Sequence, residues 1–166
     1  MRSRGQAALA GLLMLISLAS HAAPPAMADR VLIEKSSRRM TLYSHGAPIR
    51  TYKVSLGKHP IGPKQRQGDN RTPEGLYIID HRLAASTYHR ALHVSYPGPQ
   101  DQARAAAQGV EPGGDIMIHG IRNGLGWLGP LHRLRDWTAG CIAVTDREIE
   151  EIWTLVPDGT TVEIKP

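Results

Sequence analysis

Short alternations of apolar and polar residues run through most of the chain, and they predict a protein built mainly of β-strands. The breaks between these segments are rich in glycine, proline and polar residues, and His45-Gly46 has the form of a hairpin turn. Many short strands with few helices favour a β-sandwich or a partly closed barrel with one or two short helices. The expected strands are 31–35, 40–44, 49–56, 76–80, 92–96, 115–119, 141–144 and 160–165.

Two segments carry helix signals instead. An Ala-rich stretch predicts a short helix over 101–108, capped by its own first residue, Asp101. Thr145 and Glu148 have the spacing of a capping box at the start of a second helix. The apolar positions of this second helix share one face, so all of them are expected to pack in the core: Ile149, Ile152, Trp153 and Val156.

The first residues have the pattern of a secretory signal peptide rather than part of a fold. Arg2 and Arg4 precede a short apolar run, and small residues follow it. The run is shorter than the roughly 20 apolar residues that a membrane-spanning helix needs. We therefore expect a signal peptide over 1–22, with cleavage as late as residue 28, and one catalytic domain over 29–166. An uncleaved N-terminal anchor is the alternative, and it would be the only contact with a membrane.

The charge of the chain is mildly positive and excludes one class of partner. The formal net charge is +5, and no dense tract of lysine or arginine is present. Nucleic acid is therefore not an expected partner. A polymer that carries free carboxylates would suit this charge.

Cys141 is the only cysteine, and this makes it the first candidate for chemistry. An unpaired thiol in an exported protein is either a small buried apolar residue or a reactive group, and composition leaves both open. His119, at the end of an expected strand, would be able to take the thiol proton. Gly140 permits a tight turn, so the amides of Gly140 and Cys141 are candidates for an oxyanion hole. No zinc-ligand spacing accompanies the thiol, and no metal is expected.

Two short motifs stand about twenty residues apart in the sequence: Ile118-His119-Gly120 and Thr138-Ala139-Gly140-Cys141-Ile142. Together they resemble the catalytic signature of the L,D-transpeptidases of bacterial cell walls (the YkuD/ErfK type). Two more stretches resemble the same family in the same order: Arg71-Thr72-Pro73-Glu74-Gly75-Leu76-Tyr77 and Pro112-Gly113-Gly114-Asp115-Ile116. The resemblance extends over about 31–165, which is nearly all of the expected domain.

The resemblance implies a mainly β catalytic domain that acts on peptidoglycan in the periplasm or cell wall. Its substrate would be a tetrapeptide stem, cleaved between the third residue, commonly meso-diaminopimelate, and the terminal D-Ala. An acyl-enzyme would form on Cys141, and an amine from another stem or from a protein lysine would resolve it. His119 would be the general base and acid, the Gly120 carbonyl would orient its ring, and Gly140 would supply an oxyanion amide. Neither a metal nor an organic cofactor is implied.

Two departures from the family signature keep other functions open. Ala139 stands where the common signature has a histidine, and Ala143 stands where it often has an arginine. A hydrolase that uses the same Cys–His site, of the L,D-carboxypeptidase or endopeptidase kind, is one alternative. A non-catalytic wall-binding relative is the other.

The segment 121–137 is expected to form a flap over the site. Within it, an aromatic ring would stack on substrate and arginines would meet stem carboxylates, at Trp127, Arg122, Arg133 and Arg135. For each single arginine, an ordinary solvated surface charge is the competing interpretation. His132 is expected at the surface, and Tyr88 is expected to serve packing.

Overall fold

Eight strands form one sheet in the part of the chain that the computed structural model describes, residues 26–166. The strand order is β3-β2-β1-β8-β4-β5-β6-β7. Most neighbours are antiparallel, but β1 with β8 and β6 with β7 are parallel. The strands are β1 (Arg30–Glu34), β2 (Arg39–Ser44), β3 (Ala47–Lys53), β4 (Gly75–Ser86), β5 (His89–Val94), β6 (Met117–His119), β7 (Ile142–Ala143) and β8 (Thr161–Lys165).

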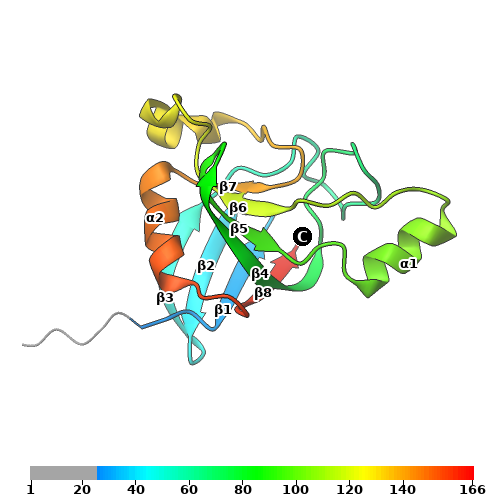
Figure 1. Cartoon of the computed structure of the whole chain (residues 1–166), viewed down its shortest axis with the longest axis horizontal. Coiled ribbons are helices and arrows are strands. Elements are labelled where there is room, and N and C mark those ends of the chain that lie inside the picture. Colours follow the sequence, from blue (N-terminus) through cyan, green and yellow to red (C-terminus); the bar gives the residue numbers. More distant parts are fainter. Residues whose placement is uncertain (1–25) are drawn as a thin grey trace, which may run out of the picture.

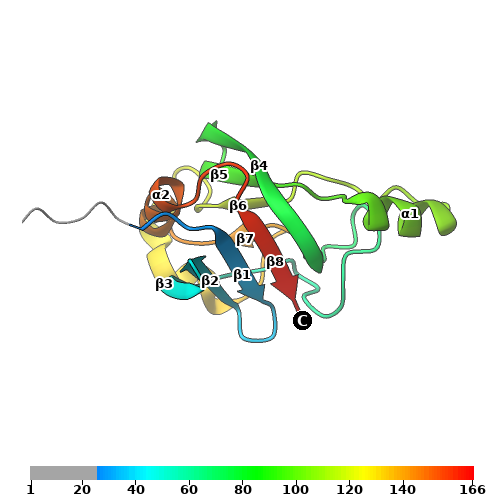
Figure 2. The same cartoon turned by 90° about the horizontal axis from the view of Figure 1, so that it is seen from below.

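The sheet curls until its two outer strands nearly meet, as Figure 2 shows from below. Just after β3, Ser55 exchanges two backbone hydrogen bonds of 2.9 Å with Ala143 of β7. Gly57 makes a second isolated bridge to Thr138. Pairing the edges in this way leaves fewer unsatisfied backbone groups. The prediction of a mainly β, partly closed architecture is confirmed, in the form of one curled sheet.

Three short helical segments accompany the sheet: α1 (Pro99–Ala107), the 3₁₀ segment η1 (Gly126–Leu134) and α2 (Asp146–Leu155). The first, α1, projects away from the sheet, whereas α2 lies along it (Figure 1). The predicted capping box at the start of α2 is confirmed. The predicted cap of α1 is wrong, because Gly98 is the cap and Pro99 opens the helix. Asp101 is buried instead and accepts a hydrogen bond of 3.0 Å from the Tyr77 hydroxyl.

The core lies inside the curl of the sheet and is closed on one side by α2. Alternation along the central strands aims every second residue inward, so that Val31 faces Val162 and Ile33 faces Ile164 across the β1–β8 ladder. Fully burying a side chain of this size contributes about 1.5–3 kcal/mol. Other fully buried apolar side chains are Met40, Leu42, Leu56, Ile79, Leu92, Val94, Ile118, Ile142, Ile149 and Ile152.

The expectation that Trp153 lies in the core is only partly right. Its indole packs against the core but stays half-buried. The guanidinium groups of Arg82 and Arg90 each lie 4.8 Å from the ring centroid. The ring therefore covers the edge of the core, and cations shield its outer side.

The predicted signal peptide over 1–22 lies outside the described residues. Ala28 belongs to the fold, because it is 3% exposed and its amide donates to the Leu155 carbonyl at 2.8 Å. A cut after residue 28, the latest expected position, would remove this packed residue. Within residues 26–166, none of the helices has the length and apolar character needed to cross a bilayer.

Candidate active site

The pairing of β6 with β7 brings His119 and Cys141 to one face of the sheet. In this parallel ladder Ile118 faces Ile142 and His119 faces Ala143. Cys141 comes directly before β7, so its side chain points to the same side as those of Ala143 and His119. Both functional side chains line one pocket of about 450 Å³. The fold therefore brings together the two groups that the sequence singled out.

His119 is held in a defined tautomer. Its Nδ1 lies 2.6 Å from the Gly120 carbonyl oxygen. A carbonyl can only accept, so Nδ1 carries the proton and Nε2 keeps a free lone pair. The ring is 3% exposed and packs against Tyr88, with 4.6 Å between centroids, and against Trp137, with 5.7 Å. This burial lowers the pKa of His119, which keeps the imidazole neutral and able to accept a proton.

The Cys141 thiol is protonated and turned toward a carbonyl in the resting structure. Its Sγ donates to the Asp115 oxygen at 3.4 Å. Burial raises the pKa of the thiol, and a hydrogen bond from the Met117 amide opposes this effect without cancelling it. The directions of the two pKa shifts therefore favour a neutral thiol and a neutral imidazole over an ion pair.

Thr138 shapes the turn that precedes the thiol. Its hydroxyl donates to the Cys141 carbonyl at 2.7 Å and accepts from the Gly140 amide at 3.1 Å. Gly140 has φ of 142°, and a Cβ atom at this position would lie 2.7 Å from the Arg71 carbonyl oxygen. Only glycine fits here. The Gly140 amide already has an acceptor, so its expected service in an oxyanion hole would require that hydrogen bond to break.

Asp136 ties the segment before the nucleophile to the strand region opposite. One carboxylate oxygen accepts from the Leu56 amide at 2.9 Å, and the other pairs with Arg38 at 2.9 Å. The backbone continues this attachment, because Thr138 donates to the Leu56 carbonyl at 3.1 Å and accepts from Lys58 at 3.0 Å. The stretch Asp136-Trp137-Thr138 is therefore a strap, anchored at both ends, that fixes the position of Cys141.

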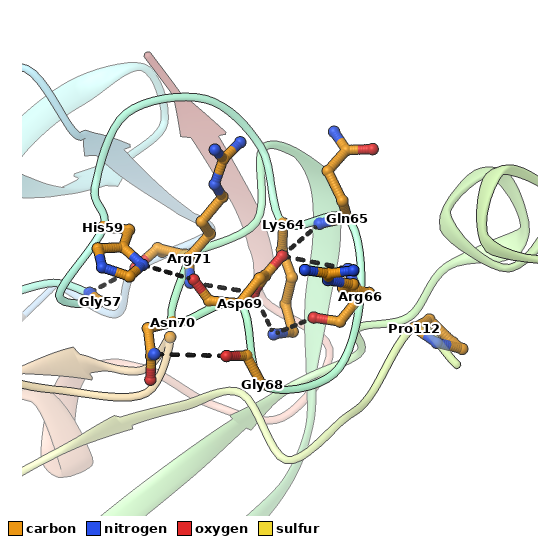
Figure 3. Close-up of polar contacts among 12 residues, drawn as sticks. Gly57, His59, Lys64, Gln65, Arg66, Gly68, Asp69, Asn70, Arg71 and Pro112 are labelled. Carbon is orange, nitrogen blue, oxygen red and sulfur yellow. Dashed lines mark hydrogen bonds and ion pairs between the residues drawn. The ribbon is translucent and has the colours of Figure 1, made fainter. Parts of the chain in front are cut away.

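The long loop 57–71 packs against the turn that carries Cys141. Figure 3 shows its organising group, the Asp69 carboxylate. This carboxylate accepts from the Lys64 ammonium at 2.8 Å and from three backbone amides, those of Gln65, Arg66 and Arg71. Because the Arg71 carbonyl lies against Gly140, the order of the loop is transmitted to the turn that carries Cys141.

Because of Asp69, the free energy of unfolding should depend on pH in the acid range. Burial alone would raise its pKa, but hydrogen bonds from Lys64 and the loop amides outweigh burial and lower the pKa to about 2, from 3.8. A carboxyl with a lowered folded pKa stabilises the fold above pH 3.8, and this contribution disappears as the pH falls toward 2. We expect the free energy of unfolding to lose about 2 kcal/mol from this group over that interval.

Denaturant unfolding between pH 5 and pH 2 measures this loss. Asp69→Asn should be less stable at pH 5 and should show a flatter pH dependence than the wild type. Asp158→Asn, which alters an exposed carboxylate paired with Arg82, is the matched control and should keep the wild-type slope. Equal slopes for Asp69→Asn and the wild type would contradict the assignment.

The flap residues that were expected to bind substrate do not form one group. Trp127 is 77% exposed and lines neither the pocket of Cys141 nor the larger pocket beside it. Arg133 is engaged in an ion pair with Glu148. Arg122 and Arg135 line the neighbouring pocket, a mainly apolar cavity of about 570 Å³. Of the four candidates, these two arginines are the ones that line the pocket next to that of Cys141.

Two aromatic residues lie beside the site: Tyr88, which was expected only to serve packing, and Trp137, which was not predicted as a site residue. Tyr88 occupies the turn between β4 and β5, and Trp137 lies within the strap; each lines both pockets and contacts the His119 ring. His132 is not at the surface as expected, because it is 7% exposed and its Nδ1 accepts from the Trp137 indole at 3.3 Å. Burial, followed by the charge of Arg133, lowers the pKa of His132 to about 4.

The comparison with known proteins agrees with this geometry. The model of the L,D-transpeptidase catalytic domain (YkuD) matches residues 28–164. The chain therefore belongs to the L,D-transpeptidase family. An Escherichia coli (strain K12) protein named "Putative L,D-transpeptidase YafK" is 30% identical over 132 residues, which are 76% of this chain and 46% of that protein. The chain thus spans about half the length of the curated relatives it matches.

Solved structures show the same fold. The helical cell shape determining protein Pgp2 from Campylobacter jejuni superimposes with a TM-score of 0.59 at 26% identity, over 82% of this chain and 48% of that one. Mycobacterium tuberculosis L,D-transpeptidase 1 superimposes with a TM-score of 0.50 at 16% identity, over 82% and 60% of the two chains. At 16% identity, the second likeness concerns the fold alone.

Proposed function

We propose that this chain is an exported cysteine L,D-transpeptidase that acts on the tetrapeptide stems of peptidoglycan. The observation that carries the proposal is that Cys141 and His119 line one pocket on adjacent strands, with the imidazole tautomer set by the Gly120 carbonyl. Membership of the family supplies the substrate class. The products would be cross-links between stems or stems joined to a protein lysine.

In the first half-reaction the thiol turns from the Asp115 carbonyl toward His119, whose Nε2 takes its proton. The sulfur attacks the carbonyl carbon between the third stem residue and D-Ala. The Cys141 amide stabilises the oxyanion, and the Gly140 amide joins it if it leaves Thr138. Collapse of the intermediate expels D-Ala, which receives the proton from His119, and leaves a thioester on Cys141.

In the second half-reaction an amine attacks the thioester. His119 accepts the amine proton, the new amide bond forms and the thiol is regenerated with that proton. Water in place of the amine would give hydrolysis from the same intermediate. Ala139 is exposed and lines the pocket, so replacing the usual histidine there changes the pocket wall and leaves the proton acceptor, His119, intact.

Product analysis distinguishes transfer from hydrolysis. The full chain is incubated with a purified disaccharide-tetrapeptide, and the mixture is separated and weighed by mass spectrometry. We expect cross-linked dimers together with free D-Ala, and neither with Cys141→Ala. Tripeptide and D-Ala without dimers would replace transfer with hydrolysis. An unchanged substrate with correctly folded protein would favour the non-catalytic alternative.

A further inference from the structure

Outside the pocket of Cys141, one cluster of side chains in the described part of the chain has the composition of a metal site. Asp80 and His81 lie on β4, and His93 lies opposite them on β5. One ligand atom from each residue lies within 4.8 Å of the other two. The donors are two imidazoles and one carboxylate, a combination that binds zinc in proteins and leaves an open coordination position.

A β-bulge creates the cluster. The pairing of β4 with β5 shifts between Ile79, which faces Val94, and His81, which faces His93. Asp80 is therefore the extra residue of the bulge, which re-aims the side chains that follow it. Without the bulge, His81 would share the inward face of Ile79, since residues two apart in a strand point the same way. With it, Asp80 and His81 both reach His93.

The three side chains are already in mutual contact. The Asp80 carboxylate lies 2.6 Å from Nδ1 of His93 and 3.0 Å from Nδ1 of His81. The two imidazoles stack, with 4.3 Å between ring centroids. Donors bound at about 2.1 Å in a tetrahedral zinc site lie about 3.4 Å apart. The present contacts of 2.6 and 3.0 Å are shorter than this spacing, so the side chains would have to separate by rotation to admit an ion.

The cluster is accessible and belongs to the same face of the sheet as the catalytic pocket. His81 and Asp80 are exposed, while His93 is half-buried. His93 pairs with Met117 of β6, and Met117 lies beside Cys141. Two strand spacings therefore separate the cluster from the nucleophile, roughly 10 Å between Cα atoms. That distance makes the cluster separate from the Cys–His pair.

We propose that Asp80, His81 and His93 form a binding site for a divalent transition-metal ion of the zinc type, with water or a carboxylate oxygen in the remaining position. The charge balance suits the ion, because one carboxylate and two neutral imidazoles leave the bound dication with a single net positive charge. In the metal-free chain the same contacts hold the bulge together as hydrogen bonds.

Titration of the tag-free full chain with ZnCl₂ in a calorimeter tests the proposal, and the d–d absorption of added Co²⁺ reports the coordination geometry. We expect one equivalent of Zn²⁺ to bind. Asp80→Asn and His93→Gln should each weaken binding by at least about tenfold, since even the loss of a supporting contact to a metal ligand costs this much. His81→Gln, at a more exposed ligand, keeps the test valid if His93→Gln folds poorly.

Two controls separate this site from others. His45→Asn removes an exposed turn histidine and should leave the affinity unchanged. Cys141→Ala should also leave it unchanged, and loss of binding in that variant would assign the metal to the catalytic thiol and overturn the proposal. No binding by the wild type, or wild-type affinity in Asp80→Asn and His81→Gln, would overturn it as well. None of these readouts depends on transpeptidase activity.

Discussion

Replacing Cys141 with alanine is expected to abolish covalent acylation of the chain. The thiol is the only one in the sequence, and it shares its pocket with the imidazole that would accept its proton. A carbapenem, whose ring opens on an attacking thiolate to leave an acyl adduct, is a convenient probe. Intact-mass spectrometry should show one adduct on the wild type and none on Cys141→Ala.

A matched control keeps this test specific. Met117 also lines the pocket. Its contact with the Cys141 sulfur is made by the backbone amide, so a change of side chain leaves that contact in place. Met117→Leu conserves volume and should therefore still form the adduct. Thermal unfolding of each variant checks that the fold persists. An adduct on Cys141→Ala, or its absence from the wild type, would contradict a nucleophilic role for Cys141.

Replacing His119 with glutamine is expected to slow acylation by about 10²–10⁴-fold, the usual contribution of a general base. Glutamine can still donate to the Gly120 carbonyl, but it cannot take the thiol proton. His45→Asn changes an exposed histidine far from the pocket and should leave the rate unchanged. A wild-type acylation rate in His119→Gln would exclude His119 as the base.

The pH dependence of acylation gives a second readout for His119. Burial lowers the pKa of this imidazole from 6.5, so the base stays neutral to lower pH than a free histidine. The acid limb of the rate profile should therefore lie below pH 6.5. Burial also raises the pKa of Cys141, so direct alkylation of the thiol should still be increasing above the usual thiol pKa of about 8.5. An acid limb above 6.5 would contradict a lowered pKa for His119.

Local patterns predicted most of the strands and the start of α2. The alternation in β1 and β8 and the capping box at Thr145 act over a few residues, so they are legible without the fold. The second half of β4 was missed, because residues 81–86 have little buried surface and no apolar alternation. That half is held by pairing with β5, which is a contact between distant residues.

The residues of the candidate active site also fall into two groups, those that local sequence predicted and those that only distant contacts bring together. The family motif identified Cys141 and His119. A thiol can form a thioester and an imidazole can accept its proton, so these two residue types suit acyl transfer wherever they lie in the fold. Tyr88 carries no such motif, and its approach to His119 follows from the β4–β5 turn and the β5–β6 register. Trp137 stands four residues before Cys141, and this closeness in the sequence is the one signal that favours it over Trp127.

The sequence by itself determined the mainly β character of this protein, its family and the proposed pair of reacting groups, because periodicity, caps and side-chain chemistry are local properties. Only the tertiary structure decided how the sheet closes, through the bridge between Ser55 and Ala143. It also places the Arg71 carbonyl so close to residue 140 that only glycine fits there. It also decided the burial that raises the pKa of the Cys141 thiol and lowers the pKa of the His119 imidazole. Strand register and burial set these features, and both depend on contacts between residues far apart in the chain.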